Sequence, residues 1–145
     1  MNSIHPIADW IYRKYKNPKK IVEIGIGNYP IIFLDLKKCF PKCNLIATDI
    51  EKKHVSKKID PTIDNITNPN QAPYKGADLL YSIRPPYELY KYILELAEEI
   101  ESDVLIMPLS SEESPVSGKL VNHSGNSFYF WNKKQLKNTA ERDGR

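Results

Sequence analysis

The sequence contains few of the residues that mark secreted, membrane-spanning or zinc-binding proteins. Its only cysteines are Cys39 and Cys43, which we expect to be reduced thiols. Three histidines, His5, His54 and His123, are scattered without the spacing of a zinc finger, so we expect no metal site. No apolar run reaches the roughly 18 residues of a transmembrane helix, and no signal-peptide pattern opens the chain. These absences predict a cytoplasmic protein with no membrane partner.

Arginine is also scarce. Four arginines, at positions 13, 84, 142 and 145, accompany 17 lysines, and the formal net charge is +3. Nucleic-acid-binding surfaces usually cluster arginine and have a higher isoelectric point. The charge therefore gives only weak support to a nucleic-acid partner.

Apolar residues follow the spacing of helices and of buried strands in turn, along a chain long enough for one domain. The spacing predicts helices over 6–16, 30–39 and 86–101, strands over 20–25, 44–49, 77–83 and 103–107, and a short strand around Ile63. A hairpin with its turn at Gly125 should join 120–123 to 127–131. We expect a single Rossmann-like domain with an N-terminal helix over 1–132 and a fraying polar tail over 133–145.

This alternation predicts an α/β fold with three layers, in which helices cover both faces of a mostly parallel Rossmann-like sheet. The sheet should end in a C-terminal antiparallel hairpin. In the helix over 30–39, Ile31, Leu34 and the stem of Lys38 should face the sheet. Residues 128–131 are all aromatic, so alternate side chains should be core, and the others could form an exposed partner surface. The Ser-rich segment 109–119 is predicted to be a loop.

The first two predicted strands end in residues that suit a nucleotide. The first carries Glu23, Gly25 and Gly27, and the second ends in Asp49. The glycines let the chain turn sharply and bring backbone N–H groups to a ligand. Asp49 could accept hydrogen bonds from a ribose diol, or could cap a helix. A tight turn at the glycines with no ligand is the alternative.

Glu23 narrows the choice of ligand. S-adenosylmethionine (SAM) brings a carboxylate and an α-ammonium, and Glu23 could hold the ammonium. The pyrophosphate of NAD has no use for an acid at this position. SAM is therefore the cofactor that we expect to bind. Ile50 could pack on the adenine or sit in the core, and Asp64 could bind the adenine amino group or be a surface acid.

The segment from Ser82 to Tyr87 resembles the Asp/Asn-Pro-Pro-Tyr motif of amino-group methyltransferases, in which the first residue accepts hydrogen bonds from the target amine. Here Arg84 takes that place, and a guanidinium only donates. Arg84 would instead suit a carboxylate or phosphate on SAM or on a substrate, or could pair with Glu88 on the surface. Arg84 and Tyr87 are the catalytic candidates.

Over residues 20–131 these motifs resemble the class I SAM-dependent methyltransferase superfamily. The segments 23–27, 47–50 and 83–88 together are similar to a small archaeal family of uncharacterised Rossmann-like proteins. The resemblance implies the fold and a nucleotide-binding rim. Tyr29 stands where a third glycine often follows in methyltransferases, so the loop should be tighter or partly blocked.

Three functions agree with these observations. The first is a small methyltransferase whose acceptor lies near Arg84 and Tyr87. The second is a non-catalytic nucleotide-binding or regulatory module that acts as a subunit of a complex, which implies a protein partner or a second copy of the chain. The third is an NAD-linked enzyme.

Overall fold

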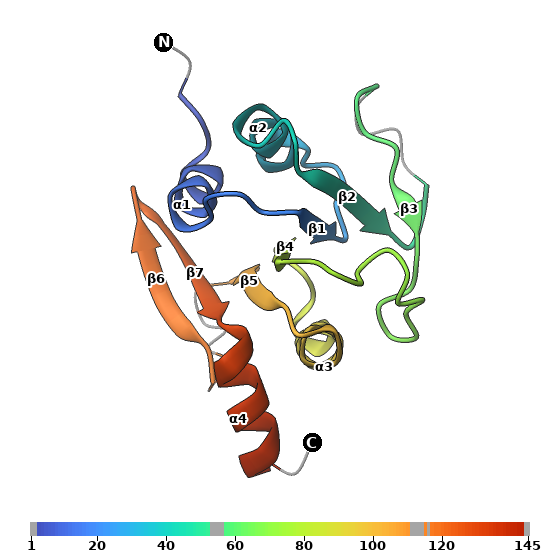
Figure 1. The fold of residues 1–145 in the computed structure, drawn as a ribbon, viewed down its shortest axis with the longest axis vertical. Helices are drawn as coiled ribbons and strands as arrows, with labels where there is room; N and C mark the ends of the chain where they lie inside the picture. Colours follow the sequence, from blue (N-terminus) through green and yellow to red (C-terminus); the bar gives the residue numbers. More distant parts are fainter. Residues whose placement is uncertain (1–2, 53–56, 111–114, 116, 144–145) are drawn as a thin grey trace.

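A computed structural model describes residues 3–52, 57–110, 115 and 117–143 of the chain. Its strands form a seven-stranded sheet with the order β3-β2-β1-β4-β5-β7-β6 (Figure 1). The strands are β1 (Lys20–Ile24), β2 (Asn44–Asp49), β3 (Thr62–Ile63), β4 (Leu79–Ile83), β5 (Asp103–Met107), β6 (Lys119–His123) and β7 (Asn126–Trp131). The pairs among β1 to β5 are parallel, whereas β7 runs antiparallel to both β5 and β6. The predicted α/β fold with a closing antiparallel hairpin is confirmed.

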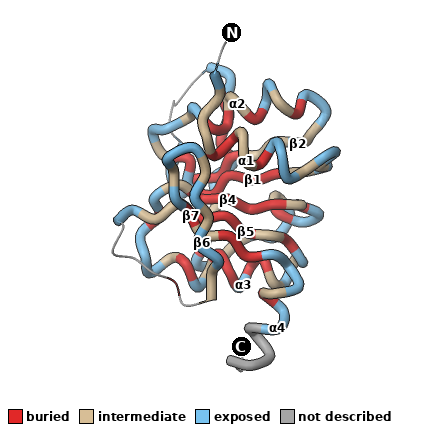
Figure 2. The backbone as a smooth tube through the Cα atoms, turned by 90° about the vertical axis from the view of Figure 1, so that its left-hand side faces the viewer, coloured by how far each residue is buried: buried red, intermediate tan, exposed pale blue. Residues whose placement is uncertain are grey.

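Helices cover both faces of this sheet (Figure 1). One face carries α1 (Pro6–Lys14) and α2 (Ile31–Cys39), and the other carries the 3₁₀ turn η1 (Tyr87–Leu89), α3 (Tyr90–Ile100) and α4 (Lys133–Asp143). Ile21 and Tyr81 pack on the α1 and α2 side, and Val22 and Leu80 pack with α3 on the other. The central strands are buried on both faces, which explains why their sequences show no polar alternation (Figure 2).

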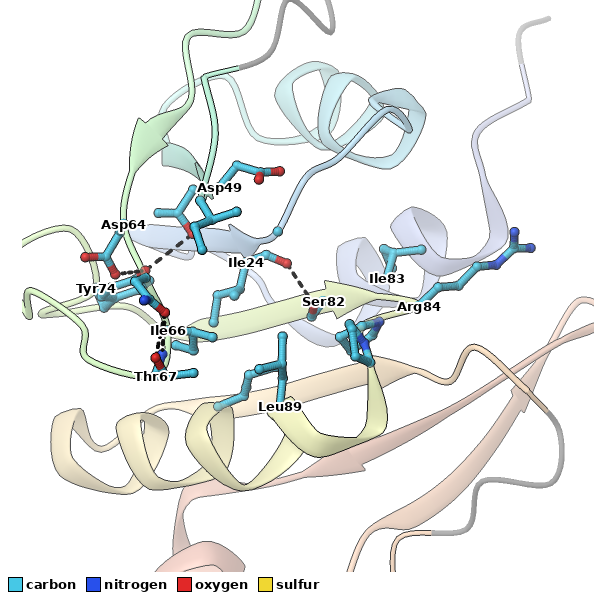
Figure 3. A pocket seen from close by; sticks show the side chains of 17 residues that line it. Ile24, Asp49, Asp64, Ile66, Thr67, Tyr74, Ser82, Ile83, Arg84 and Leu89 are labelled. Atoms are coloured by element: carbon cyan, nitrogen blue, oxygen red, sulfur yellow. Dashed lines mark hydrogen bonds between the residues drawn. The ribbon is translucent and has the colours of Figure 1, made fainter.

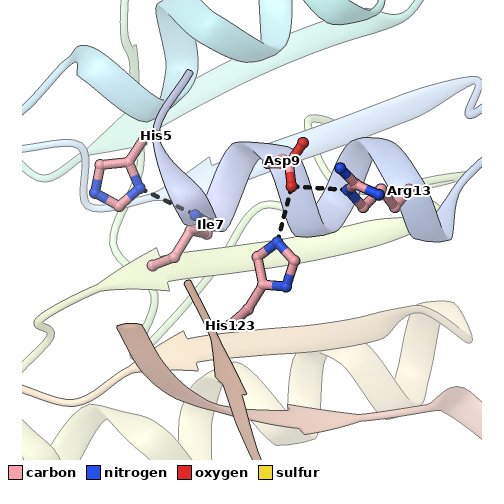
Figure 4. Close-up of polar contacts among 5 residues, drawn as sticks. All are labelled: His5, Ile7, Asp9, Arg13 and His123. Carbon is pink, nitrogen blue, oxygen red and sulfur yellow. Dashed lines mark hydrogen bonds and ion pairs between the residues drawn. The ribbon is translucent and has the colours of Figure 1, made fainter. Parts of the chain in front are cut away.

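The hairpin of β6 and β7 is fastened to α1 by a polar cluster (Figure 4). Asp9 Oδ2 on α1 lies 2.8 Å from Nε2 of His123 on β6 and 2.8 Å from Nε of Arg13. His5 caps α1, because its Nδ1 accepts the N–H of Ile7 at 3.1 Å. The turn between the two strands has positive φ at both central positions, 48° at Ser124 and 83° at Gly125. That is the geometry which closes two-residue hairpins and confirms the predicted turn.

The structure differs from the expected polar tail. Residues from Lys133 to Asp143 form α4, and Leu136 is buried in the same cluster as Trp131 and Ile93. The exposed aromatic pair that the sequence left open is not formed, because Phe128, Phe130 and Trp131 are all buried. Whether 1–132 is an independent domain stays a prediction.

Helix α2 is rotated relative to the expectation. Its buried residues are Ile32, Phe33 and Leu36, while Ile31 is 48% exposed and Lys38 is exposed. The predicted inward placement of Ile31 and Lys38 is thus wrong. Apolar residues are adjacent at the start of α2, so the sequence allows more than one choice of buried face. Packing against α1 and the sheet selects one of them.

Short turns flank β3 in the described residues on either side of it. In the described residues between β2 and β4 there is no helix, and β3 is only two residues long. Of the segments discussed above, His54, residues 111–114 and residue 116 lie outside the described residues. The turns after β3 form part of the wall of the site.

Candidate functional site

The carboxyl ends of β1 to β4 bring most of the predicted site residues together around one cavity of about 480 Å³, which we call the first cavity (Figure 3). Gly25 follows β1, Asp49 ends β2 and Ile50 follows it, and Asp64 and Asn65 follow β3. Much of the lining is apolar. The remaining lining residues are Ile24, Thr48, Ile66, Thr67, Tyr74, Ser82, Ile83, Arg84, Pro85, Pro86, Leu89 and Ile93. Parallel strands that end at one edge thus gather residues from distant segments.

Asp49 organises the glycine loop. Its Oδ2 accepts the N–H of Gly27 at 2.7 Å, and its Oδ1 accepts the N–H of Glu51 at 3.3 Å. The N–H groups of Gly25 and Ile26 donate to the carbonyl of Thr48 at 2.8 and 3.1 Å. Gly25 and Gly27 have φ of 70° and 56°, a region that favours glycine. The N–H groups of residues 25 to 27 are therefore engaged within the protein, contrary to the expectation that they face a ligand.

Asp64 is also held in place. Its Oδ2 accepts a 2.5 Å hydrogen bond from the Tyr74 hydroxyl, and its Oδ1 accepts the N–H of Asn70 at 3.0 Å. Tyr74 is buried, and burial followed by the carboxylate of Asp64 raises the pKa of its phenol. Because each carboxylate oxygen has two lone pairs, Asp49 and Asp64 keep capacity for further donors. Tyr74 and Asn65 were not predicted, since no local pattern marks them.

Glu23 lies inside the sheet. Its side chain is 1% exposed, and its Oε1 accepts a 2.6 Å hydrogen bond from the hydroxyl of Tyr81 on β4. Its Oε2 has no hydrogen-bond partner among the described residues. Burial raises the pKa of Glu23 to about 8, and the charge of Asp49 adds to the rise. Glu23 does not line either cavity described here, so its contact with an ammonium group stays a prediction.

Arg84 ends β4 in an unusual conformation. Its φ is 56°, in the left-handed region that L residues rarely adopt, and its N–H donates to the carbonyl of Met107 at 2.7 Å. Two prolines follow it. Figure 3 shows its side chain extending away from Asp64 and Tyr74. No ion pair joins Arg84 to Glu88 or to another carboxylate in the described part of the chain.

Tyr87, the second catalytic candidate, is not brought to the first cavity. Its ring is 49% exposed and lies 4.8 Å from the ring of Tyr90 at the start of α3. The turn that follows the prolines directs it outward. The structure therefore groups Arg84, and not Tyr87, with the predicted nucleotide residues.

A second cavity of about 490 Å³ adjoins the first. The two cavities share Gly25, Ile83 and Arg84. The other lining residues of the second cavity are His5, Ile26, Gly27, Asn28, Tyr29, Met107 and Asn126. Tyr29, which replaces a third glycine, is half-exposed in the wall of this second cavity and does not obstruct the first.

This strand order, with its last strand antiparallel and a cavity at the carboxyl ends, defines a methyltransferase-like Rossmann fold of class I. The chain belongs to the uncharacterised protein family UPF0146, whose sequence profile matches residues 4–133. The UPF0146 protein MJ0688 of the archaeon Methanocaldococcus jannaschii is 39% identical over 123 residues, which cover 82% of this chain and 88% of the relative. The predicted resemblance to an archaeal, uncharacterised family is confirmed.

Solved structures support the fold. The precorrin-6y C5,15-methyltransferase of Geobacter metallireducens is similar with a TM-score of 0.59 over 87% of each chain, at 8% identity. The plantazolicin methyltransferase BpumL in complex with SAH gives a TM-score of 0.51 at 20% identity, over 70% of this chain. This chain spans only 43% of BpumL. Similarity at these identities establishes the architecture alone.

No helix in the described residues is both long and apolar enough to cross a bilayer. Within the same residues, no three or more His, Cys, Asp and Glu side chains gather as a metal-binding group.

Proposed function

We propose that this chain binds SAM and acts as a small methyltransferase, with the adenosine in the first cavity. The observation that carries the proposal is the meeting of Gly25, Asp49, Ile50 and Asp64, from three separate strand ends, around one cavity. In this arrangement Asp49 accepts hydrogen bonds from the ribose diol, Ile50 packs on the adenine, and Asp64 or Asn65 binds the adenine edge.

The residues present fit an adenosyl group. A volume of about 480 Å³ lies within the range of small-ligand sites. The apolar surfaces of Ile66, Leu89 and Ile93 suit a purine ring, while the carboxylates of Asp49 and Asp64 line the same cavity and can accept from hydroxyl and amino groups. When bound, SAM supplies a methyl group on a sulfonium. Transfer of that methyl group depends chiefly on alignment of the acceptor, which the walls of the site would provide.

The glycine loop favours SAM over NAD. A pyrophosphate is normally held by the free N–H groups of this loop. Here the N–H groups of Gly25, Ile26 and Gly27 donate to Thr48 and Asp49. The loop therefore has few donors left for two phosphates, which weighs against an NAD-linked enzyme.

Calorimetric titration with SAM, S-adenosylhomocysteine (SAH) and NAD tests the proposal. Ile50→Ala should weaken SAH binding roughly tenfold, because it removes three carbons of apolar contact. Ile63→Ala is the matched control, since Ile63 is similarly exposed, at 60% against 65%, but does not line the cavity. Absence of SAM and SAH binding by the wild-type protein would refute the proposal, and equal effects of the two substitutions would refute the assignment of the cavity.

A non-catalytic nucleotide-binding or regulatory subunit is the second candidate. One observation favours it: the donor-only guanidinium of Arg84 stands where an amine acceptor is expected. Incubation with methyl-labelled SAM and pools of small molecules, RNA and protein distinguishes the two. Incorporation of label would favour the enzyme, whereas SAH binding without incorporation would favour the subunit.

A further inference from the structure

The second cavity is rich in hydrogen-bond donors. Arg84, Asn28, Asn126 and Tyr29 can all donate into it, and no Asp or Glu lines it among the residues that the structure describes. His5 belongs to the same set. Because the Nδ1 of His5 accepts the N–H of Ile7, its neutral ring carries its proton on Nε2 and can donate there. The carboxylate of Asp35 accepts the backbone N–H of His5 at 2.8 Å.

Arg84 gives the cavity its charge. The guanidinium has no carboxylate partner in the described part of the chain, and no other arginine there lines the cavity. Its backbone is fixed between the hydrogen bond to Met107 and the two prolines, in spite of an unfavourable φ. Residues held in such conformations cluster at functional sites. Arginine also offers two parallel N–H groups to a carboxylate or phosphate.

The volume of the second cavity exceeds what SAM alone requires. It is as large as the first cavity, about 490 against about 480 Å³. The amino-acid arm of SAM is much smaller than its adenosine, so the arm leaves most of this space free. The shared residues Gly25, Ile83 and Arg84 place that space beside the end of the first cavity where the reactive methyl would lie.

We propose that the second cavity binds a second small molecule through its carboxylate or phosphate group, with Arg84 as the pairing cation and His5 and Asn126 as neutral donors. This inference rests on the proposed function, because it takes the second molecule to be the methyl acceptor. It names the acceptor by class: an anionic metabolite rather than a nucleic acid or a cationic amine.

A titration of the SAH-saturated protein tests this anion site. Inorganic phosphate and acetate are added in turn, and NMR follows the Arg84 Nε signal and the side-chain amide signal of Asn126. One or both anions should shift these signals saturably. Arg84→Gln should weaken that binding roughly tenfold, as expected for loss of a charge-assisted pair. The anion affinity of Arg84→Lys should lie between those of the wild-type protein and Arg84→Gln. Arg13→Gln is the matched control, because it removes the same charge from a residue that pairs with Asp9 outside the cavity.

Three outcomes would overturn the inference. The first is the absence of a saturable shift with either anion, and the second is an equal loss in the Arg84→Gln and Arg13→Gln variants. The third is a weaker affinity of Arg84→Gln for SAH with unchanged affinity for 5′-methylthioadenosine, which lacks the amino-acid arm. In that case Arg84 binds the carboxylate of SAM itself. If SAH does not bind, the proposed function fails, and the titration of the free protein still decides whether the anion site exists.

Discussion

The Tyr81 hydroxyl on β4 donates a 2.6 Å hydrogen bond to Glu23 Oε1, directly across the pair of central parallel strands. Both side chains are buried, and burial raises the pKa of each acid. Glu23, which was predicted to hold an ammonium group, is therefore a carboxylic acid buried in the core.

Stability should fall with rising pH because of Glu23. The pKa of Glu23 is raised from 4.5 to about 8 in the folded protein, so the folded state holds a proton that the unfolded state releases. This contribution is complete below pH 4.5 and is lost as the pH rises to about 8. The slope is at most about 1.4 kcal/mol per pH unit. Urea denaturation at a series of pH values measures it.

Glu23→Gln, which keeps the shape and an acceptor for Tyr81, should flatten the dependence over that range. Glu95→Gln on the exposed side of α3 is the control and should leave the slope intact. An unchanged slope in Glu23→Gln would mean that the carboxyl group does not hold the extra proton.

Tyr74→Phe should lower the free energy of unfolding by about 1–2 kcal/mol, because it removes the hydrogen bond that the buried Tyr74 hydroxyl donates to the half-buried carboxylate of Asp64. It should also loosen the turns after β3 and so weaken SAH binding. Thermal denaturation and calorimetry check the two effects. Tyr12→Phe, at an exposed position on α1, should change neither. Retention of full stability by Tyr74→Phe would contradict the role given to this hydrogen bond.

Leu136→Ala should destabilise the whole protein by about 2–5 kcal/mol, since Leu136 is 1% exposed and anchors α4 to the core. Leu120→Ala on the edge strand β6 is the matched control. Leu120 is 51% exposed, so its loss should cost less than about 0.5 kcal/mol. Chemical denaturation measures both. Similar values for the two variants would show that α4 is not part of the cooperative unit.

Gly118→Ala should disturb the packing of Trp131. A methyl group at position 118 would come within 2.6 Å of the Trp131 ring, and relief of such overpacking costs about 1–3 kcal/mol. Tryptophan fluorescence and chemical denaturation report the change. In a double-mutant cycle, Trp131→Phe should remove much of the penalty because the smaller ring vacates that space. Additive effects of the two substitutions would disprove the steric explanation.

The sequence predicts the fold and much of the first cavity for one physical reason. Carboxyl ends of parallel strands share an edge, so Gly25, Asp49 and Asp64 could be assigned to one site from their positions alone. The same reasoning could not foresee Tyr81 beside Glu23, because that contact depends on the register between β1 and β4.

Other features leave no local signal. Helix α4 has a single buried leucine, Leu136, in an otherwise polar segment, so its pattern is that of a solvated tail. The second cavity joins His5, before the first helix, to Asn126, in the last hairpin. These two parts of the chain meet only because the hairpin of β6 and β7 packs beside α1 at the end of the sheet.

The left-handed backbone conformation at position 84 favours residues other than the arginine that is present there. An L residue with φ of 56° carries a penalty of about 1–2 kcal/mol that glycine would not. Asparagine tolerates this region better and would also restore the amine acceptor of the Pro-Pro-Tyr motif. Selection for foldability alone would therefore favour either residue over arginine. Under the proposed function, arginine at this strand end supplies a positive charge in spite of the conformational penalty.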